Sequence, residues 1–352
     1  MNRWISGDRK LLVCEVIVVL SFAVCAPAVR CDHIYPVRVV SYANLGAGVY
    51  GFPDAVLGPP TKWIKEPGGP GVPSGIYACS MVYGAWNVSP DGLPLVVTLG
   101  NATVQGEIIV EFDPPIYDDP ANWYGLDFTV FGNSAFVGSG YVTYNTDMST
   151  YRINNNASIV GESVIISVSP NGSDWYQYSL PVADSYWPTN SFSWDAENHT
   201  WGGELDPAKP VDPNLTPNDF AGRYVVDAIE LYKGSAGGTS YDLAHAGFGW
   251  IKYIKLTSKG GEVDAVARVR KPLTIAEAKG LADGTVVSLG PSHVTAGSDE
   301  FADCCYVQSF DRTSGIKVMG RSAQAGSTVL VTGTIETESG ERVIRASWLG
   351  TQ

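Results

Sequence analysis

The sequence predicts a mainly β protein, in which an antiparallel β-sandwich is followed by a small five-stranded barrel. Composition is the first reason: 39 Gly and 22 Pro, with 18 Tyr and 10 Trp against 17% charged residues, suit many short strands joined by turns. The second reason is the pattern, because several segments alternate or run apolar over strand lengths. A chain of 352 residues has room for two such domains, each with its own core.

Strand candidates follow one another from residue 36 onward. The clearest local signal is a hairpin, in which Asn171-Gly172 supplies the turn between 164–168 and 175–178. These segments are enough for two packed sheets. The candidates lie at 36–42, 95–99, 107–112, 126–131, 163–169, 175–178, 224–232 and 250–256.

The sequence changes character between 260 and 271, and we predict a domain boundary there, with a sandwich domain at 29–266 and a second domain at 267–352. The second domain begins with a short predicted helix at 275–281, where Thr274 and Glu277 form a capping box. A small barrel accommodates the strands that follow. These are expected at 285–295, 304–310, 315–319, 328–337 and 342–346.

Residues 1–28 are typical of an export signal. Arg3, Arg9 and Lys10 form a basic region, 11–24 is mostly apolar, and Ala26-Pro27-Ala28 fits a small-residue cleavage site. The apolar run is shorter than the ~20 residues of a spanning helix, so cleavage is favoured over a membrane anchor. We expect a secreted or cell-surface protein with no transmembrane helix in the mature chain.

After cleavage the chain would keep four cysteines, and an exported protein permits disulfides. Cys31 and Cys79 are a candidate pair that would tie the amino-terminal strand to a loop. Adjacent Cys304 and Cys305 are too close for an unstrained bridge. No spacing suggests zinc, and buried, structural sulfur is the favoured interpretation.

The formal net charge of −13 lies entirely before residue 268, because the remainder holds nine basic and nine acidic residues. An acidic first part repels a polyanion and a neutral second part does not attract one, which argues against nucleic acid as a partner. Cations and neutral glycans fit such a surface better.

Three strings carry a family resemblance: GLDFTVFGN at 125–133, VSPNGSDW at 168–175 and GGTSYDLAHAGF at 237–248. With shorter matches at 52–58, 97–100, 106–112, 250–256 and 262–266, their order resembles exported bacterial and archaeal cell-surface proteins with a Gly-rich, Trp-rich, jelly-roll-like β-sandwich. The resemblance covers about 38–266. It implies fold and location better than activity.

The C-terminal region resembles oligonucleotide/oligosaccharide-binding (OB) barrels that are appended to exported bacterial proteins. The matching segments are 281–287, 306–308, 312–318 and 331–334. This implies an OB-fold-like domain. Cys304 and Cys305 stand where ordinary strand residues are expected, which leaves a ligand or redox role open.

Calcium is the predicted cofactor, because hard cations prefer carboxylate and amide oxygens from acidic loops. Four candidate ligands recur at the family-like strings, and one belongs to a matching strand: Asp127, Asn133, Asp242, Asp264 and Glu107. The competing interpretation is that such loop residues accept hydrogen bonds from nearby backbone amides.

A long loop at 184–220 is rich in aromatic residues that suit carbohydrate binding, because apolar ring faces stack on sugars. The candidates are Trp187, Trp194, Trp201 and Tyr186. The competing interpretation is that these rings form a small core for the loop itself.

We therefore predict an extracellular or cell-surface, non-enzymatic binding or structural protein that is stabilised by calcium and binds a glycan or another cell-surface component. No catalytic residue is predicted, because no motif places a nucleophile. One alternative is a carbohydrate-active enzyme or its accessory module. Another is a self-assembling surface-layer or filament subunit, a homo-oligomer joined through an unpaired edge strand.

Overall fold

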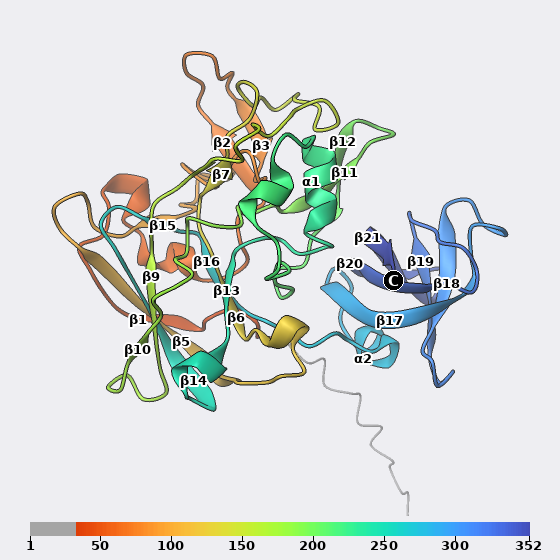
Figure 1. Cartoon of the computed structure of the whole chain (residues 1–352). Helices are drawn as coiled ribbons and strands as arrows, with labels where there is room; N and C mark the ends of the chain where they lie inside the picture. Colours follow the sequence, from red (N-terminus) through yellow and green to blue (C-terminus); the bar gives the residue numbers. More distant parts are fainter. Residues whose placement is uncertain (1–32) are drawn as a thin grey trace, which may run out of the picture.

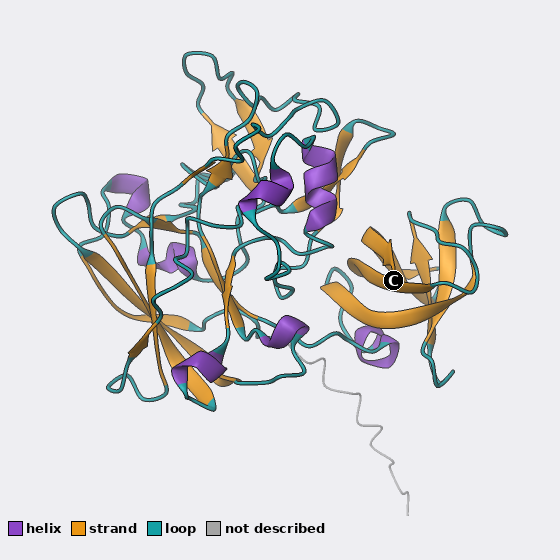
Figure 2. Cartoon of the chain, in the orientation of Figure 1, coloured by secondary structure: helices purple, strands orange, loops and turns teal. Residues whose placement is uncertain are grey.

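The computed structural model describes residues 33–352 and is mainly β, with an antiparallel sandwich and a closed C-terminal barrel (Figures 1 and 2). The predicted fold class is therefore confirmed. The predicted export signal and Cys31 lie outside the described residues. Within those residues, the structure contains no helix with the length and apolar character to cross a membrane.

The larger sheet of the sandwich has five antiparallel strands and is centred on β5 and β14. Ile108, Val110 and Phe112 of β5 alternate toward a buried core, as the period of a strand requires. In spatial order the strands are β1 (Arg38–Ala43), β5 (Gly106–Tyr117), β14 (Trp250–Ser258), β9 (Ile165–Ser169) and β10 (Tyr176–Gln177).

The second sheet has β6 (Phe128–Phe131) between β13 (Thr239–Tyr241) and β16 (Ala265–Arg268). All four residues of β6 are buried because both faces of this sheet are covered. Phe128 and Val130 pack in the core shared with the five-stranded sheet, while Phe131 packs in a second core.

The second core is closed by α1 (Val225–Leu231), so the prediction of a strand at 224–232 is wrong. Val225, Ala228, Ile229 and Tyr232 are all buried, and their spacing of three and four residues places them on one face of a helix. The β-branched residues at 225, 226 and 229 favoured a strand locally, but burial of this helical face prevails.

Short paired strands and single 3-10 turns build the loops around the sandwich. The pairs are β2 (Trp63–Glu66) with β3 (Gly75–Ala78), β4 (Val97–Thr98) with β15 (Glu262–Val263), β7 (Ala135–Phe136) with β8 (Ile159–Val160), and β11 (Phe192–Asp195) with β12 (Thr200–Glu204). The turns are η1 (Gly48–Tyr50), η2 (Pro53–Val56), η3 (Trp123–Gly125), η4 (Pro217–Phe220) and η5 (Leu243–Ala246).

The C-terminal strands close into a barrel in the order β17-β18-β19-β21-β20, and β20 pairs back with β17. The predicted capping box is confirmed at α2 (Ile275–Lys279), where Thr274 and Glu277 exchange hydrogen bonds. Cys305 is fully buried in the barrel core. The strands are β17 (Val286–Ala296), β18 (Cys304–Gln308), β19 (Gly315–Met319), β20 (Thr328–Glu338) and β21 (Glu341–Thr351).

The barrel packs on the sandwich domain through β20 and β21, which contact the β11–β12 hairpin (Figure 1). Lys209, only 1% exposed, lies at this interface. Its ammonium nitrogen is 4.6 Å from the ring centre of Trp123 in the sandwich domain and 4.8 Å from that of Trp348 in the barrel. It also donates a hydrogen bond to the backbone oxygen of Lys233 at 2.5 Å. One buried cation thus joins both domains.

Candidate functional site

A pocket of about 530 Å³ opens on the sandwich domain next to β13. Three segments that are distant in the sequence form most of it: the chain after β10, the loop between β12 and η4, and the turn from β13 into η5. Leu126, just before β6, adds a fourth contribution. Its lining residues are Leu126, Tyr178, Leu180, Pro181, Tyr186, Trp187, Val211, Pro213, Leu215, Thr216, Pro217, Thr239, Ser240, Tyr241, Asp242 and His245.

Hydrogen bonds fix the 180–187 loop against β13. The Tyr241 hydroxyl donates to the backbone oxygen of Pro181 at 3.0 Å, and the Thr239 hydroxyl donates to that of Tyr186 at 3.1 Å. The backbone amide of Gly238 donates to the carbonyl of Trp187 at 2.8 Å. Gly238 has φ +82 and a Cβ there would clash with Phe131, so a glycine is needed at this close approach. The aromatic wall of the pocket is therefore held by the sheet.

Aromatic and polar side chains both line the pocket. Tyr186 is 38% exposed, whereas Trp187 is half-buried and packs on Phe220 with ring centres 5.7 Å apart. Asp242 is half-buried and His245 is exposed at η5. One carboxylate oxygen of Asp242 accepts a hydrogen bond from the backbone amide of Ala244 at 2.7 Å, within the same turn.

Asp242 also belongs to an acidic cluster, in which Asp118, Asp127 and Asp242 bring one carboxylate oxygen each within 4.8 Å of one another. Asp127 is fully buried and accepts hydrogen bonds from the backbone amides of Asp119 and Leu243 and from the side chain of Asn122. Burial raises the pKa of Asp127 to about 6, and the negative charge of Asp118 adds to the shift. The cluster therefore concentrates negative charge that no ion pair within residues 33–352 neutralises.

The five residues predicted as calcium ligands do not form one site. Asp127 and Asp242 meet in the cluster, and Asp118 joins them. Asp264 instead accepts two hydrogen bonds from Thr61, one from its amide at 2.9 Å and one from its hydroxyl at 2.8 Å. Asn133 donates to Glu262, and Glu107 pairs with Ala43 and Thr257 in the larger sheet.

The four aromatic residues predicted for glycan binding separate into two pairs. Tyr186 and Trp187 line the pocket, whereas Trp194 and Trp201 lie in the β11–β12 hairpin with ring centres 5.1 Å apart. Trp194 is 6% exposed, and its indole N–H donates to the Ser149 hydroxyl at 2.9 Å. Trp194 therefore belongs to the core.

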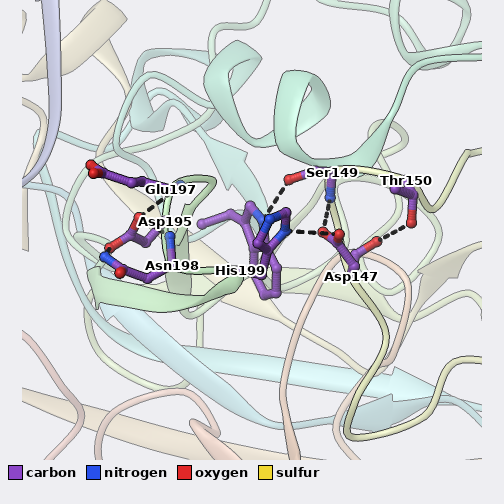
Figure 3. Close-up of polar contacts among 8 residues, drawn as sticks. Asp147, Ser149, Thr150, Asp195, Glu197, Asn198 and His199 are labelled. Carbon is purple, nitrogen blue, oxygen red and sulfur yellow. Dashed lines mark hydrogen bonds and ion pairs between the residues drawn. The ribbon is translucent and has the colours of Figure 1, made fainter.

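Polar contacts hold the tip of the same hairpin in place. Figure 3 shows His199 reaching Asp147, with the ring nitrogen Nδ1 at 2.9 Å from the carboxylate, while Asp195 accepts from Glu197 and Asn198. These contacts close a local turn and connect it to the 147–150 loop. The hairpin is thus a packing element between the sandwich and the barrel.

Cys79 is a free, fully buried thiol in the structure, and burial raises its pKa. Its proposed disulfide partner, Cys31, lies outside the described residues. The Cys31–Cys79 bridge therefore stays a prediction.

Several residues of the pocket and cluster were not predicted, among them Asp118, Tyr178, Tyr241 and His245. The string GGTSYDLAHAGF contains Tyr241 and His245, so the sequence indicated the segment but not which of its side chains line the pocket. Asp118 directly follows β5. The pair Asp118-Asp119 after an apolar strand is a sequence pattern that could have identified Asp118 as a candidate ligand.

The lining residues Tyr186, Trp187 and Asp242 can contact a ring-shaped, hydroxyl-rich molecule, and the carboxylate cluster that includes Asp242 can hold a cation. Asp242 is the one carboxylate among the residues lining the pocket. No protein-family model, no curated protein and no solved structure matches the chain.

Proposed function

We propose that this is an exported or cell-surface, non-enzymatic protein that binds a glycan in the pocket beside β13. The observation that carries the proposal is that Tyr186, Trp187, Asp242 and His245 line one cavity of about 530 Å³. The acidic, non-basic character of the chain supports a neutral or cationic ligand.

The aromatic and polar side chains that line the pocket suit a sugar ring. Aromatic faces gain from covering the apolar C–H face of a ring, and the fixed loop lowers the entropy lost on binding. Asp242, which uses one carboxylate oxygen within its own turn, offers the other to ligand hydroxyls. The cavity volume lies within the range of pockets that take small ligands.

Binding is better supported than glycoside hydrolysis. Hydrolysis commonly uses two carboxyl groups that flank the scissile bond about 5 to 10 Å apart. Of the three clustered carboxylates only Asp242 lines the pocket, and Asp127 is fully buried with three hydrogen bonds. Its raised pKa is explained by burial, without a catalytic role.

On a glycan array, the protein is expected to retain a restricted set of glycans, and Tyr186→Ala is expected to weaken the best of them at least ten-fold. The loss follows from removing the exposed stacking ring. Isothermal titration with that glycan measures the change. Tyr141→Ala is the matched control, because Tyr141 is 73% exposed and does not line the pocket.

Equal loss in both tyrosine variants would point to a general effect of surface aromatics and would contradict the proposed pocket. Absence of any retained glycan on a broad array would remove carbohydrate as the ligand class. Hydrolysis of a retained glycan would favour the enzyme alternative.

We also propose that the carboxylate cluster holds a calcium ion that braces the pocket wall. Within the described residues the Asp118 side chain makes no hydrogen bond, Asp242 has one oxygen without a partner, and Asp127 has spare acceptor capacity at Oδ2. Calcium takes six to eight oxygens, so backbone carbonyls or waters would complete the set.

Calcium is expected to raise the melting temperature of the wild-type protein, and a chelator is expected to lower it. Asp118→Asn is the informative variant, because it removes a charge without removing a hydrogen bond. Without calcium this variant should be as stable as wild type or more stable, since the repulsion on Asp127 is relieved. With calcium it should be less stable. Calorimetry with and without the ion measures this crossing, and a wild-type melting temperature indifferent to both additions would contradict the site.

A further inference from the structure

A second cavity, of about 400 Å³, lies between the two domains. Ile34, Tyr35 and the Pro59-Pro60 pair form its wall on the sandwich side. The barrel contributes the segment around Leu281, Ala282 and Val286. The lining is mostly apolar and comes from both domains, which is the usual setting of small-molecule sites.

The charged groups around this interdomain cavity are neutralised in pairs. Lys62 and Glu204 form an ion pair with nitrogen and oxygen 2.6 Å apart. Arg270, in the linker, lies 3.2 Å from a carboxylate oxygen of Asp206 and donates to the backbone oxygen of Val286 at 2.9 Å. A charged ligand would gain no unpaired counter-charge from these groups and would lose its hydration.

The cavity is preformed because the interface around it is fixed. Arg270 connects Asp206 of the sandwich domain to β17 of the barrel, and its backbone amide donates to the oxygen of Ala208 at 3.0 Å. Lys209, which follows Ala208 in the sequence, is the buried cation that lies between one indole ring of each domain. A ligand therefore pays little to organise the walls.

We propose that the interdomain cavity binds an uncharged, mostly apolar small molecule that carries one or two hydrogen-bonding groups. Such a ligand would place its apolar body against the prolines and the barrel segment. Thr285 lines this cavity, and its hydroxyl, which makes no hydrogen bond within the described residues, is available for a polar contact. This site is separate from the proposed glycan pocket, since the two share no lining residue.

Because the ligand contacts both domains, its binding also stabilises their arrangement. A molecule that binds only the folded, docked state raises the apparent stability by mass action. Ligand occupancy would then be coupled to how firmly the barrel holds the sandwich domain.

The test uses the full chain and the neutral fluorophore N-phenyl-1-naphthylamine. The expected result is saturable binding at one site per chain with a blue-shifted emission. Ala282→Trp, which places a large ring at a lining position, should weaken binding at least ten-fold. Ala276→Trp is the matched control, because Ala276 is exposed on α2, close in sequence to Ala282, and does not line the cavity. Ala282→Leu should give an intermediate loss and keeps the test valid where the tryptophan variant does not fold.

The sulfonated analogue 8-anilinonaphthalene-1-sulfonate tests the charge preference and should bind at least ten-fold more weakly. Wild-type affinity in both Ala282 variants would overturn the assignment, because the dye would then occupy another place. Failure of the full chain to bind the neutral dye would overturn it as well, including the case in which the chain's own first residues fill the cavity. Equal affinity for both dyes would overturn the uncharged ligand class.

Discussion

Lys209→Ala is expected to lower the free energy of unfolding by about 3 kcal/mol and to expose the interdomain linker to proteolysis. The substitution removes two desolvated cation–π contacts and leaves a cavity where a 1%-exposed side chain was packed. Urea unfolding, together with limited digestion near 268–272, measures both effects. We also expect the barrel surface that carries Trp348 to separate from the sandwich domain.

Lys209→Met separates packing from charge. Methionine keeps most of the buried volume, and removal of a buried charge is often neutral or stabilising. At pH 7 this variant should therefore lie within about 1 kcal/mol of wild type or above it. A loss equal to that of Lys209→Ala would instead assign the stability to the charge.

The stabilities of wild type and Lys209→Met should differ in their dependence on pH, and the direction of the difference follows from the pKa of Lys209. Burial lowers the pKa of Lys209 from 10.5 to about 8 in the folded protein. Between these values the unfolded chain binds more protons than the folded protein, so wild-type stability rises with pH in that window. The slope is at most about 1.4 kcal/mol per pH unit. Lys209→Met lacks this contribution, so the difference in stability, wild type minus variant, should increase from pH 8 to pH 10.

Gly234→Ala is the second change with a large expected effect, a loss of about 3 kcal/mol or more in the free energy of unfolding. Gly234 has φ +88, and a Cβ there would lie far inside van der Waals contact with Thr332 of β20. Thr332 is fully buried and its hydroxyl is 2.8 Å from that of Ser288, so it cannot move aside. The loop after α1 would have to separate from the barrel.

Gly247→Ala is the matched control for backbone strain. Gly247 has φ +68, but a Cβ there meets no atom within 4 Å. Its substitution should cost only the left-handed conformation, about 1 to 2 kcal/mol. Similar melting temperatures for the two variants would show that the close approach of Gly234 to the barrel contributes nothing.

The strands and the barrel were predictable because their signals are local. The Asn171-Gly172 turn and the Thr274–Glu277 capping box act within a few residues, and both occur where expected. The segment at 224–232 was misassigned because its β-branched residues favour a strand in isolation. Only the core formed by Phe131 and Phe220 shows why a helical face is buried there.

The pocket and the interface were not predictable in the same way. Tyr186 and Asp242 are more than 50 residues apart in the sequence and meet only because the 180–187 loop is bonded to β13. Lys209 lies between an alanine and a proline in a polar loop, where a lysine is ordinarily solvated. Its burial depends on Trp123 and Trp348, one from each domain, and no local sequence pattern predicts that these two rings come together around Lys209.

The closure of the C-terminal barrel determines where further copies of the chain can be added. A closed barrel offers no open backbone template, and the larger sheet ends at β10, which has only two residues, and at β1, whose pairing with β5 is interrupted by a bulge between Val39 and Ser41. Interrupted and very short edges are poor templates for strand addition. Growth of a polymer by strand addition to the barrel or to the larger sheet is therefore disfavoured, and an array joined at either of these would connect its subunits through side-chain surfaces.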